Sequence, residues 1–393
     1  MIDSSKNNFS SSESSGQSLK AENFPHEIFL HYKPERDVLF ILGAGASHPD
    51  GVPLQKHILP SILAGDKKEI SESEIGKEFS KFFYSNFKAE KDSYPELEAV
   101  FGFLDYFIQQ NESLNQEYTV AKIIRIKEYL IKLVHYIIDY SVSDTSKYYN
   151  LFWESVHSLN RNTSFITLNY DTLFEQAFET IAPKSGYIDY CIDLMNYEKR
   201  EIFKPFNFWI NPREPVMVNQ RDDPVSYKII KMHGSLNWKY CNCCNQTLLT
   251  PWDRSIDLNQ GKLLGYTYPD KQVYEYKCPL DGTEFQTLIM PPSFVKPLYQ
   301  HIISQLLNEA SKEIRIAKRV IFVGYSLSNS DIHIKAVFKK NLSPNAELIV
   351  INPRKKESLE LNYRALSDNA QFINCSFEEM VQDEALMKRL LTL

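Results

Sequence analysis

The stretch Asp37-Val-Leu-Phe-Ile-Leu42, followed at once by Gly43-Ala44-Gly45-Ala46-Ser47, decides the fold of this chain. A continuous apolar run of this length is typical of a strand that is buried on both faces of a parallel sheet. Glycines directly after such a strand allow a tight turn and the close approach of a pyrophosphate to the backbone. The pattern predicts a nucleotide-binding turn, although a plain strand-to-helix turn has the same appearance.

Three further segments carry polar or glycine residues just beyond short strand-like runs. They are Thr167-Leu-Asn169-Tyr-Asp171, Met232-His233-Gly234-Ser235 and Gly324-Tyr325-Ser326-Leu327. The carboxyl ends of neighbouring parallel strands meet at one edge of an open α/β sheet, and ligands bind there. We therefore expect all four segments to form a single nucleotide site.

Composition limits the classes of protein that remain. The chain has 393 residues, of which 43% are hydrophobic, and its formal net charge is −6. This is enough apolar material for a full core, and the acidic balance makes nucleic acid an unlikely partner for the chain alone. No apolar stretch approaches the length of a membrane span, and the first residues lack a secretory apolar core. Six cysteines in a chain of this length do not suggest a disulfide framework. We expect a cytoplasmic protein.

The spacing of elements predicts an interrupted α/β domain. Residues 1–26 are polar and are expected to form a disordered tail. Residues 27–55 and 159–393 alternate strands and helices, which predicts a Rossmann-like, doubly wound parallel sheet. Residues 56–158 show helical spacing and are expected to form a helical insertion beside the sheet. Within the second part, residues 239–288 are expected to form a small irregular module.

The set of motifs resembles the sirtuin-like (SIR2) family, and within it the bacterial SIR2-like branch that acts in anti-phage defence. The resemblance covers about residues 36–54 and 160–355. It implies the SIR2 fold, with NAD⁺ as substrate. The resemblance implies that three segments bind NAD⁺ around its pyrophosphate and nearby ribose. They are the glycine loop with Gly43, Ala44, Gly45 and Ser47, the segment with Thr167, Asn169 and Asp171, and the loop with Gly324, Tyr325 and Ser326. Asn352, at the end of a later strand, corresponds to the residue that meets the adenosine ribose.

The residue types suit cleavage of the nicotinamide glycosidic bond. Nicotinamide leaves as a neutral molecule, so the site has to position the ribose and an acceptor rather than supply an acid. The amide of Asn169 is suited to orient a water or a ribose hydroxyl. His233 has an ordinary pKa of about 6.5 and is suited to accept a proton from either. Asp171 would contact the carboxamide or hold Asn169 in place. We therefore predict Asn169, His233 and Asp171 as catalytic residues.

Two departures separate this chain from the protein-deacylating sirtuins. Those enzymes carry an Asp-Phe-Arg turn soon after the glycine loop, where this chain has Pro49-Asp-Gly-Val-Pro-Leu54. They also carry a Phe-Gly-Glu segment that pairs with the acyl-lysine peptide, where this chain has Leu288-Ile-Met-Pro-Pro-Ser-Phe294. Two prolines remove backbone donors at the place where the peptide would dock. Both differences favour water as the acceptor.

The cysteines leave zinc binding open. Cys241-x2-Cys244 is followed after a long gap by Cys278-Pro-Leu-Asp281, so aspartate stands where a complete zinc ribbon has its fourth cysteine. Either Cys243 or Asp281 would complete a Zn²⁺ site, and a metal-free remnant is the alternative. No metal ligand is assigned from the sequence alone.

The leading hypothesis is an NAD⁺ glycohydrolase (NADase) that releases nicotinamide and ADP-ribose and depletes NAD⁺ when phage infection triggers it. The resemblance also implies a homo-oligomer, and a separately encoded partner such as a HerA-like ATPase. Two alternatives remain: an NAD-dependent protein deacylase or ADP-ribosyltransferase, and a non-catalytic sensor of NAD⁺ or ADP-ribose. Dependence of nicotinamide release on an acyl-lysine peptide would favour the first, and tight binding without turnover would favour the second.

Overall fold

The computed structural model describes residues 26–89, 93–142, 145–181, 186–195, 209–210, 216–218, 224–250, 256–266, 273–275, 277–293, 301–328, 330–354 and 356–393. The predicted disordered tail, residues 1–26, lies outside these ranges except for its last residue. None of the helices in the described ranges is long and apolar enough to cross a membrane.

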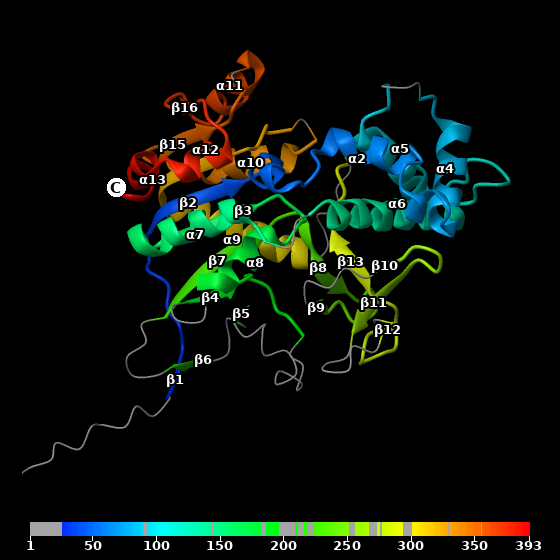
Figure 1. The fold of residues 1–393 in the computed structure, drawn as a ribbon, viewed down its shortest axis with the longest axis horizontal. Coiled ribbons are helices and arrows are strands. Elements are labelled where there is room, and N and C mark those ends of the chain that lie inside the picture. The colour runs from blue at the N-terminus through cyan, green and yellow to red at the C-terminus, as the bar shows by residue number, and fades with distance from the viewer. Residues whose placement is uncertain are drawn as a thin grey trace, which may run out of the picture.

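An eight-stranded sheet forms the centre of the described structure (Figure 1). Every neighbouring pair of strands in it is parallel. In spatial order the strands are β16 (Gln371–Ile373), β15 (Glu347–Ile351), β14 (Ala317–Val323), β2 (Arg36–Leu42), β3 (Thr163–Thr167), β7 (Val225–Lys231), β4 (Gly186–Asp189) and β5 (Trp209–Ile210). The prediction of a Rossmann-like, doubly wound parallel sheet is confirmed.

The strand order reverses beside β2. The chain runs from β2 to β3 and β7 on one side, and later returns to β14 on the other side of β2. Open α/β sheets bind ligands outside the carboxyl ends of the strands at such a reversal. The loops that follow β2, β3, β7 and β14 carry the four predicted motifs, and they all leave this same edge.

Helices cover both faces of the sheet. Helices α7 (Lys147–Leu159), α8 (Leu173–Ile181), α12 (Phe377–Gln382) and α13 (Glu384–Leu391) pack together on one face. On the other face lie α9 (His301–Ile316), α10 (Ile332–Asn341) and α11 (Glu357–Arg364). The phenyl ring of Phe322 in β14 contacts rings from both α10 and α11, which fixes these two helices against the sheet.

Between β2 and β3 the chain forms a group of helices set to one side of the sheet (Figure 1). They are α2 (Gln55–Leu63), α3 (Lys68–Ser71), α4 (Glu74–Asn86), α5 (Leu97–Gln110) and α6 (Val120–Ser141). Helix α7 lies in the same stretch of sequence, but it packs on α8, α12 and α13. We therefore describe α7 with the sheet, and α2–α6 as the helical insertion; the domain boundaries stay predictions.

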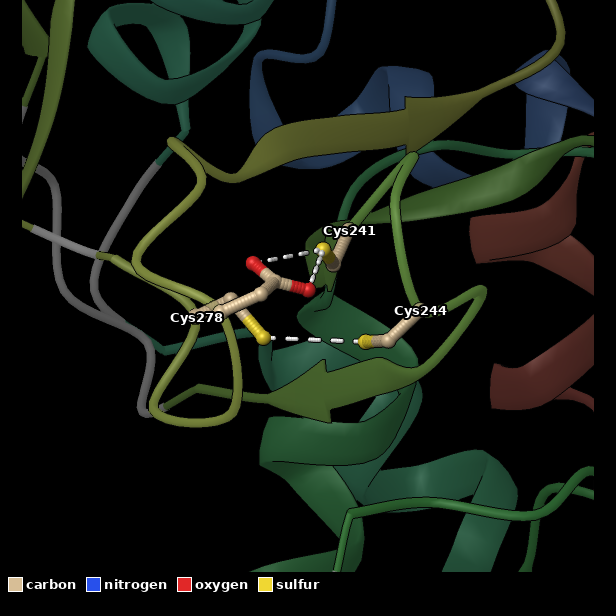
Figure 2. A group of neighbouring side chains, drawn as sticks. Cys241, Cys244 and Cys278 are labelled. Carbon is tan, nitrogen blue, oxygen red and sulfur yellow. Dashed lines mark hydrogen bonds between the residues drawn. The ribbon is translucent and has the colours of Figure 1, made fainter.

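The stretch after β7 forms antiparallel pairs beside the main sheet. Strand β8 (Gly234–Tyr240) pairs with β9 (Thr247–Leu249) and β13 (Gln286–Ile289). Strands β10 (Ile256–Asp257), β11 (Lys262–Tyr266) and β12 (Val273–Glu275) form a second small sheet, and β1 (His26–Ile28) pairs with β6 (Val216–Val218). Near these strands the thiols of Cys241, Cys244 and Cys278 gather around one carboxylate (Figure 2).

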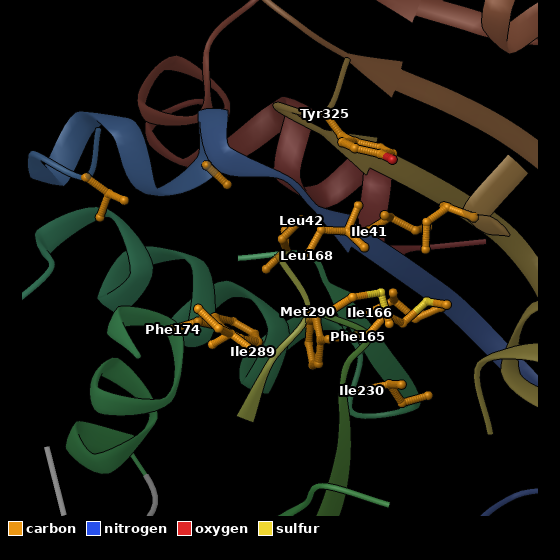
Figure 3. Close-up of a cluster of buried hydrophobic side chains, with 14 of the residues drawn as sticks. Ile41, Leu42, Phe165, Ile166, Leu168, Phe174, Ile230, Ile289, Met290 and Tyr325 are labelled. Carbon is orange, nitrogen blue, oxygen red and sulfur yellow. The ribbon is translucent and has the colours of Figure 1, made fainter. Parts of the chain in front are cut away.

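One continuous cluster of apolar side chains joins these layers. It includes residues of the central strands, such as Ile41, Phe165 and Ile230, all fully buried. Figure 3 shows that Met290 and Tyr325, from the loops after β13 and β14, belong to the same cluster. The loops that form the candidate site therefore rest directly on the core, which restricts their movement.

Candidate functional site

The loops after β2 and β14 are held against each other by backbone hydrogen bonds. The N–H of Gly43 donates to the carbonyl of Val323 at 3.0 Å, and that of Gly45 donates to the carbonyl of Gly324 at 2.9 Å. A Cβ on Gly45 would lie 2.7 Å from the Cα of Gly324, and Gly324 itself has a φ of +61°. Close contact between two loops therefore requires these glycines, a role that the sequence did not predict. The helix that follows, α1 (Ala44–Ser47), is a single turn.

Asn169 links the loop after β3 to the glycine loop. Its Nδ2 donates to the carbonyl of Gly43 at 3.0 Å and to the hydroxyl of Ser47 at 2.9 Å. Ser47 is fully buried and also bonds the hydroxyl of Tyr149 in α7 at 2.9 Å. Both amide hydrogens of Asn169 are thus engaged, which leaves the carbonyl oxygen Oδ1 as the acceptor for a further hydrogen bond. The backbone N–H of Asn169 donates to Thr167 Oγ1 at 3.1 Å, which fixes the turn.

Asp171 stabilises the turn between β3 and α8 on which Asn169 lies. Its Oδ1 accepts from the N–H of Leu173 at the start of α8, at 3.2 Å. Lys231, fully buried, donates to the carbonyl of Asp171 and to the carboxylate of Glu175, both at 2.7 Å. Burial raises the pKa of the Asp171 carboxyl, while the charge of Lys231 opposes that rise. These contacts fix the turn on which Asn169 also lies, and both roles given to Asp171 stay predictions.

His233 lies beside a carboxylate that the sequence did not single out. Its Nε2 is 3.6 Å from Oδ1 of Asp331, and both side chains are buried. The other oxygen of Asp331 accepts from the hydroxyl of Tyr325 at 2.8 Å. The ring of Tyr170, next to Asn169 in the chain, has its centroid 6.3 Å from that of His233. The loops after β3, β7 and β14 thus meet around His233.

The backbone around His233 and Tyr325 is fixed by further contacts. The carbonyl of His233 accepts from Met290 at 2.7 Å, and the hydroxyl of Tyr170 donates to the carbonyl of Met290 at 2.6 Å. Leu327, two residues after Tyr325, has a φ of +53°, a conformation that residues other than glycine adopt at a cost. Strain of this kind is frequent at ligand-binding loops. Ser326, between them, is exposed at the surface of this loop.

The helical insertion reaches the same loops. The hydroxyl of Ser330, beside Asp331, donates to Glu98 of α5 at 3.4 Å. The hydroxyl of Ser293 donates to Asp105, also of α5, at 2.6 Å. Burial raises the pKa of Tyr170, and the nearby charges of Asp331 and Glu98 raise it further. The sequence offered no signal for these contacts, because they depend on how the insertion packs.

Asn352 stands apart from the His233 group, at the end of β15. Its Oδ1 accepts from the N–H of Arg354 at 3.1 Å, which forms a tight turn. It lines a pocket of about 370 Å³ between β15, β16 and α11, which has an apolar wall and two arginines, Arg354 and Arg364. The N–H of Gly324 donates to the carbonyl of Ile351 at 3.0 Å, which connects this strand end to the rest of the site.

The cysteine group has the dimensions of a tetrahedral zinc site. Cys241, Cys244, Cys278 and Asp281 each bring one ligand atom within 4.8 Å of the others (Figure 2). Zn–S bonds of about 2.3 Å place two sulfurs about 3.8 Å apart in a tetrahedron. The sulfurs of Cys244 and Cys278 are 3.6 Å apart, and Cys241 Sγ lies 3.4 Å from a carboxylate oxygen of Asp281. Asp281 therefore fits the fourth position, and Cys243 lies outside the group. Four protein ligands leave no open position, so a zinc ion here would have a structural role.

The fold is that of an open α/β protein with glycine loops, an asparagine and a histidine at the carboxyl edge of its sheet, beside the strand reversal. The model of the SIR2-like domain family matches residues 163–373, more than half of the chain, so the chain belongs to this family. A search of curated proteins finds no match to this chain.

Several solved structures are similar over most of their length. A Sir2 homologue in complex with NAD is 13% identical and has a TM-score of 0.43, over 93% of this chain and 96% of that one. A mutant Sir2 homologue in complex with ADP-ribose is 14% identical, with a TM-score of 0.42 over 91% and 93%. Sir2Tm bound to a propionylated peptide is 14% identical, with a TM-score of 0.40 over 88% and 91%.

Proposed function

We propose that this protein is an NAD⁺ glycohydrolase that cleaves NAD⁺ to nicotinamide and ADP-ribose. The observation that carries the proposal is that Asn169 lies at the carboxyl edge of the sheet with the pair of His233 and Asp331, and that Tyr170, the next residue after Asn169, has its ring near that of His233. Membership of the SIR2-like domain family supports NAD⁺ as the substrate, since the motifs that resemble NAD-binding loops in that family fall at these positions.

Each side chain has a defined part in the reaction. Loss of neutral nicotinamide leaves an electron-poor ribose, and the acceptor must then give up a proton. Asn169 Oδ1 accepts a hydrogen bond from water or a ribose hydroxyl without adding charge, and the contacts of Nδ2 hold it in that orientation. His233 accepts the proton, and the carboxylate of Asp331, 3.6 Å from Nε2, stabilises the resulting imidazolium.

The packing of α6 against β13 argues against a peptide substrate. Among the strands in the described residues, β13 pairs with β8 alone. Adjacent side chains of a strand point to opposite faces. Nevertheless both Gln286 and Thr287 of β13 bond side chains of α6, at 3.1 Å to Glu128 and 3.1 Å to His135. Helix α6 therefore packs directly against β13, and we propose that it limits the room for a peptide to add to this strand.

The biological setting follows from the sequence resemblance. We place the protein in the cytoplasm as an anti-phage effector that depletes NAD⁺ when triggered, as a homo-oligomer and with a separately encoded partner such as a HerA-like ATPase. Contacts of α5 with Ser293 and Ser330 give the insertion a route to influence the site. A cellular test compares NAD⁺ in phage-infected bacteria that express the wild type or Asn169→Ala. A fall in NAD⁺ with the wild type alone supports this setting, and equal NAD⁺ in both contradicts it.

The enzymatic proposal is tested by nicotinamide release from NAD⁺ by purified wild type, Asn169→Ala and His233→Ala. We expect the rate of nicotinamide release to fall about 100-fold or more in Asn169→Ala and in His233→Ala, because each substitution removes a group that acts in the transition state. His57→Ala is the matched control, since His57 is exposed on α2 outside the site, and it should match the wild type. Release that requires an added acyl-lysine peptide would instead identify a deacylase. NAD⁺ binding without turnover, alone or with cell extract, would identify a sensor.

A further inference from the structure

A second group of metal-ligating side chains lies at the candidate site itself. His233 follows β7, while Asp331 and His333 stand at the start of α10. Each offers one ligand atom, and the three atoms lie within 4.8 Å of one another. His233 and Asp331 are buried, and His333 is partly exposed. Two imidazoles with one carboxylate form a common ligand set for divalent transition metals.

The separations match those around one bound ion. Zn–N and Zn–O bonds of about 2.0–2.1 Å put two ligand atoms about 3.4 Å apart in a tetrahedron, and two imidazole centroids about 5.2 Å apart. The observed distances are 3.6 Å between His233 Nε2 and Asp331 Oδ1, and 5.5 Å between the ring centroids of His233 and His333. Small side-chain adjustments would complete this geometry.

The surroundings also favour a cation. Tyr325 donates to the second oxygen of Asp331, the kind of outer hydrogen bond that orients a metal-binding carboxylate. Glu98 of α5 adds a second negative charge nearby, since it bonds Ser330 at 3.4 Å. Three protein ligands leave a fourth position for water or substrate, in contrast to the cysteine group.

We propose that His233, Asp331 and His333 bind a divalent transition metal such as Zn²⁺, and that this metal holds the enzyme inactive. An imidazole that coordinates through one nitrogen carries its proton on the other. Neither nitrogen of His233 can then accept a proton from water or a ribose hydroxyl. The metal binding stands on the geometry alone, whereas the inhibition rests on the proposed NADase function.

The first experiment measures metal binding without reference to activity. Metal-stripped wild type, His333→Ala and His333→Gln are titrated with Co²⁺ and followed by visible absorption, with His57→Ala as control. The cysteine group is intact in all of them, so any thiolate bands are shared. We expect the wild type and the control to bind one more ion per chain than the two His333 variants, with a weak band that lacks thiolate character. Equal stoichiometry and spectra in all four would overturn the proposal. His333→Gln guards against a loss of folding, because it preserves size while removing the ligand.

The second experiment measures inhibition. Micromolar Zn²⁺ should suppress nicotinamide release by the wild type, and EDTA should restore it. His333→Ala should need at least about tenfold more Zn²⁺ than the wild type to halve its own zinc-free rate of nicotinamide release. Unchanged zinc sensitivity would overturn the inhibitory role. An extra Co²⁺ site in a protein without turnover would support the metal site and refute the NADase function, so the two failures are distinguishable.

Discussion

Replacement of Gly45 by alanine tests whether glycine is required here because the loops after β2 and β14 are in close contact. The new Cβ would lie 2.7 Å from Gly324 Cα and 2.8 Å from Gly324 O, both of them backbone atoms that cannot rotate away. Carbon atoms normally approach to about 3.5–4.0 Å, so the loops must separate by roughly 1 Å. Overpacking of this kind costs about 1–3 kcal/mol, and the hydrogen bond from Gly45 to Gly324 contributes about 1 kcal/mol more. We expect Gly45→Ala to destabilise the protein by about 2–4 kcal/mol.

Thermal unfolding of ligand-free protein measures this effect. At roughly 2–4 °C per kcal/mol for a large domain, the melting temperature should fall by about 4–16 °C. Gly102→Ala is the matched control, because Gly102 lies within α5 and a Cβ there meets no atom within 4 Å. That variant should gain up to about 1 kcal/mol from higher helix propensity.

A different result would refute the reasoning. If Gly45 served only to let a pyrophosphate approach, Gly45→Ala would keep or raise the melting temperature and lose NAD⁺ binding alone. Equal effects of the two substitutions would likewise show that the contact with Gly324 carries no energy.

Three more predictions concern buried charge and metal. Glu313→Gln should lower the melting temperature at pH 7. Burial acts to raise the pKa of Glu313, but the charges of Arg36 and Lys228 bring that pKa below the ordinary value of 4.5. The ionised carboxylate therefore stabilises the folded protein above pH 4.5, and this stabilisation is lost in acid. The gap between wild type and variant in thermal scans should therefore close as the pH falls below 4.5, and a constant gap would contradict this. Lys231→Met should lower the free energy of unfolding in urea by about 3–5 kcal/mol, because it leaves the buried carboxylate of Glu175 without its partner. The decrease should be smaller when Glu175 is also replaced by an apolar residue. Asp281→Ala should lower the zinc content of purified protein by about one ion per chain while Cys243→Ser leaves it unchanged, and the reverse pattern would assign the fourth ligand to Cys243.

Local sequence was sufficient for the main sheet. The run Val320-Ile-Phe-Val323 and the run Leu348-Ile-Val-Ile351 are short, apolar and followed by glycine or asparagine, and they form β14 and β15. Such strands are buried on both faces, so their composition alone identifies them. Because parallel strands share one carboxyl edge, the convergence of the loops after them also followed from the pattern.

The parts that escaped prediction depend on long-range packing. Strand β8 begins at Gly234, inside the predicted histidine motif, and its polar composition does not resemble a buried strand. Asp331 became a candidate only when the fold placed it beside His233. Nothing in the spacing of α5 indicated that Glu98 would reach Ser330. The role of Gly45 was also out of reach, since its neighbour lies far along the chain.

The most direct test of the central claim is to measure the products formed from NAD⁺ alone. The account predicts that purified wild-type protein, freed of metal at the His233 group, releases nicotinamide and ADP-ribose in equal amounts. It also predicts that Asn169→Ala, folded as judged by thermal unfolding, releases neither. Turnover that persists in Asn169→Ala, or nicotinamide release only with an acylated peptide or protein acceptor, would contradict the assignment of this site as an NADase.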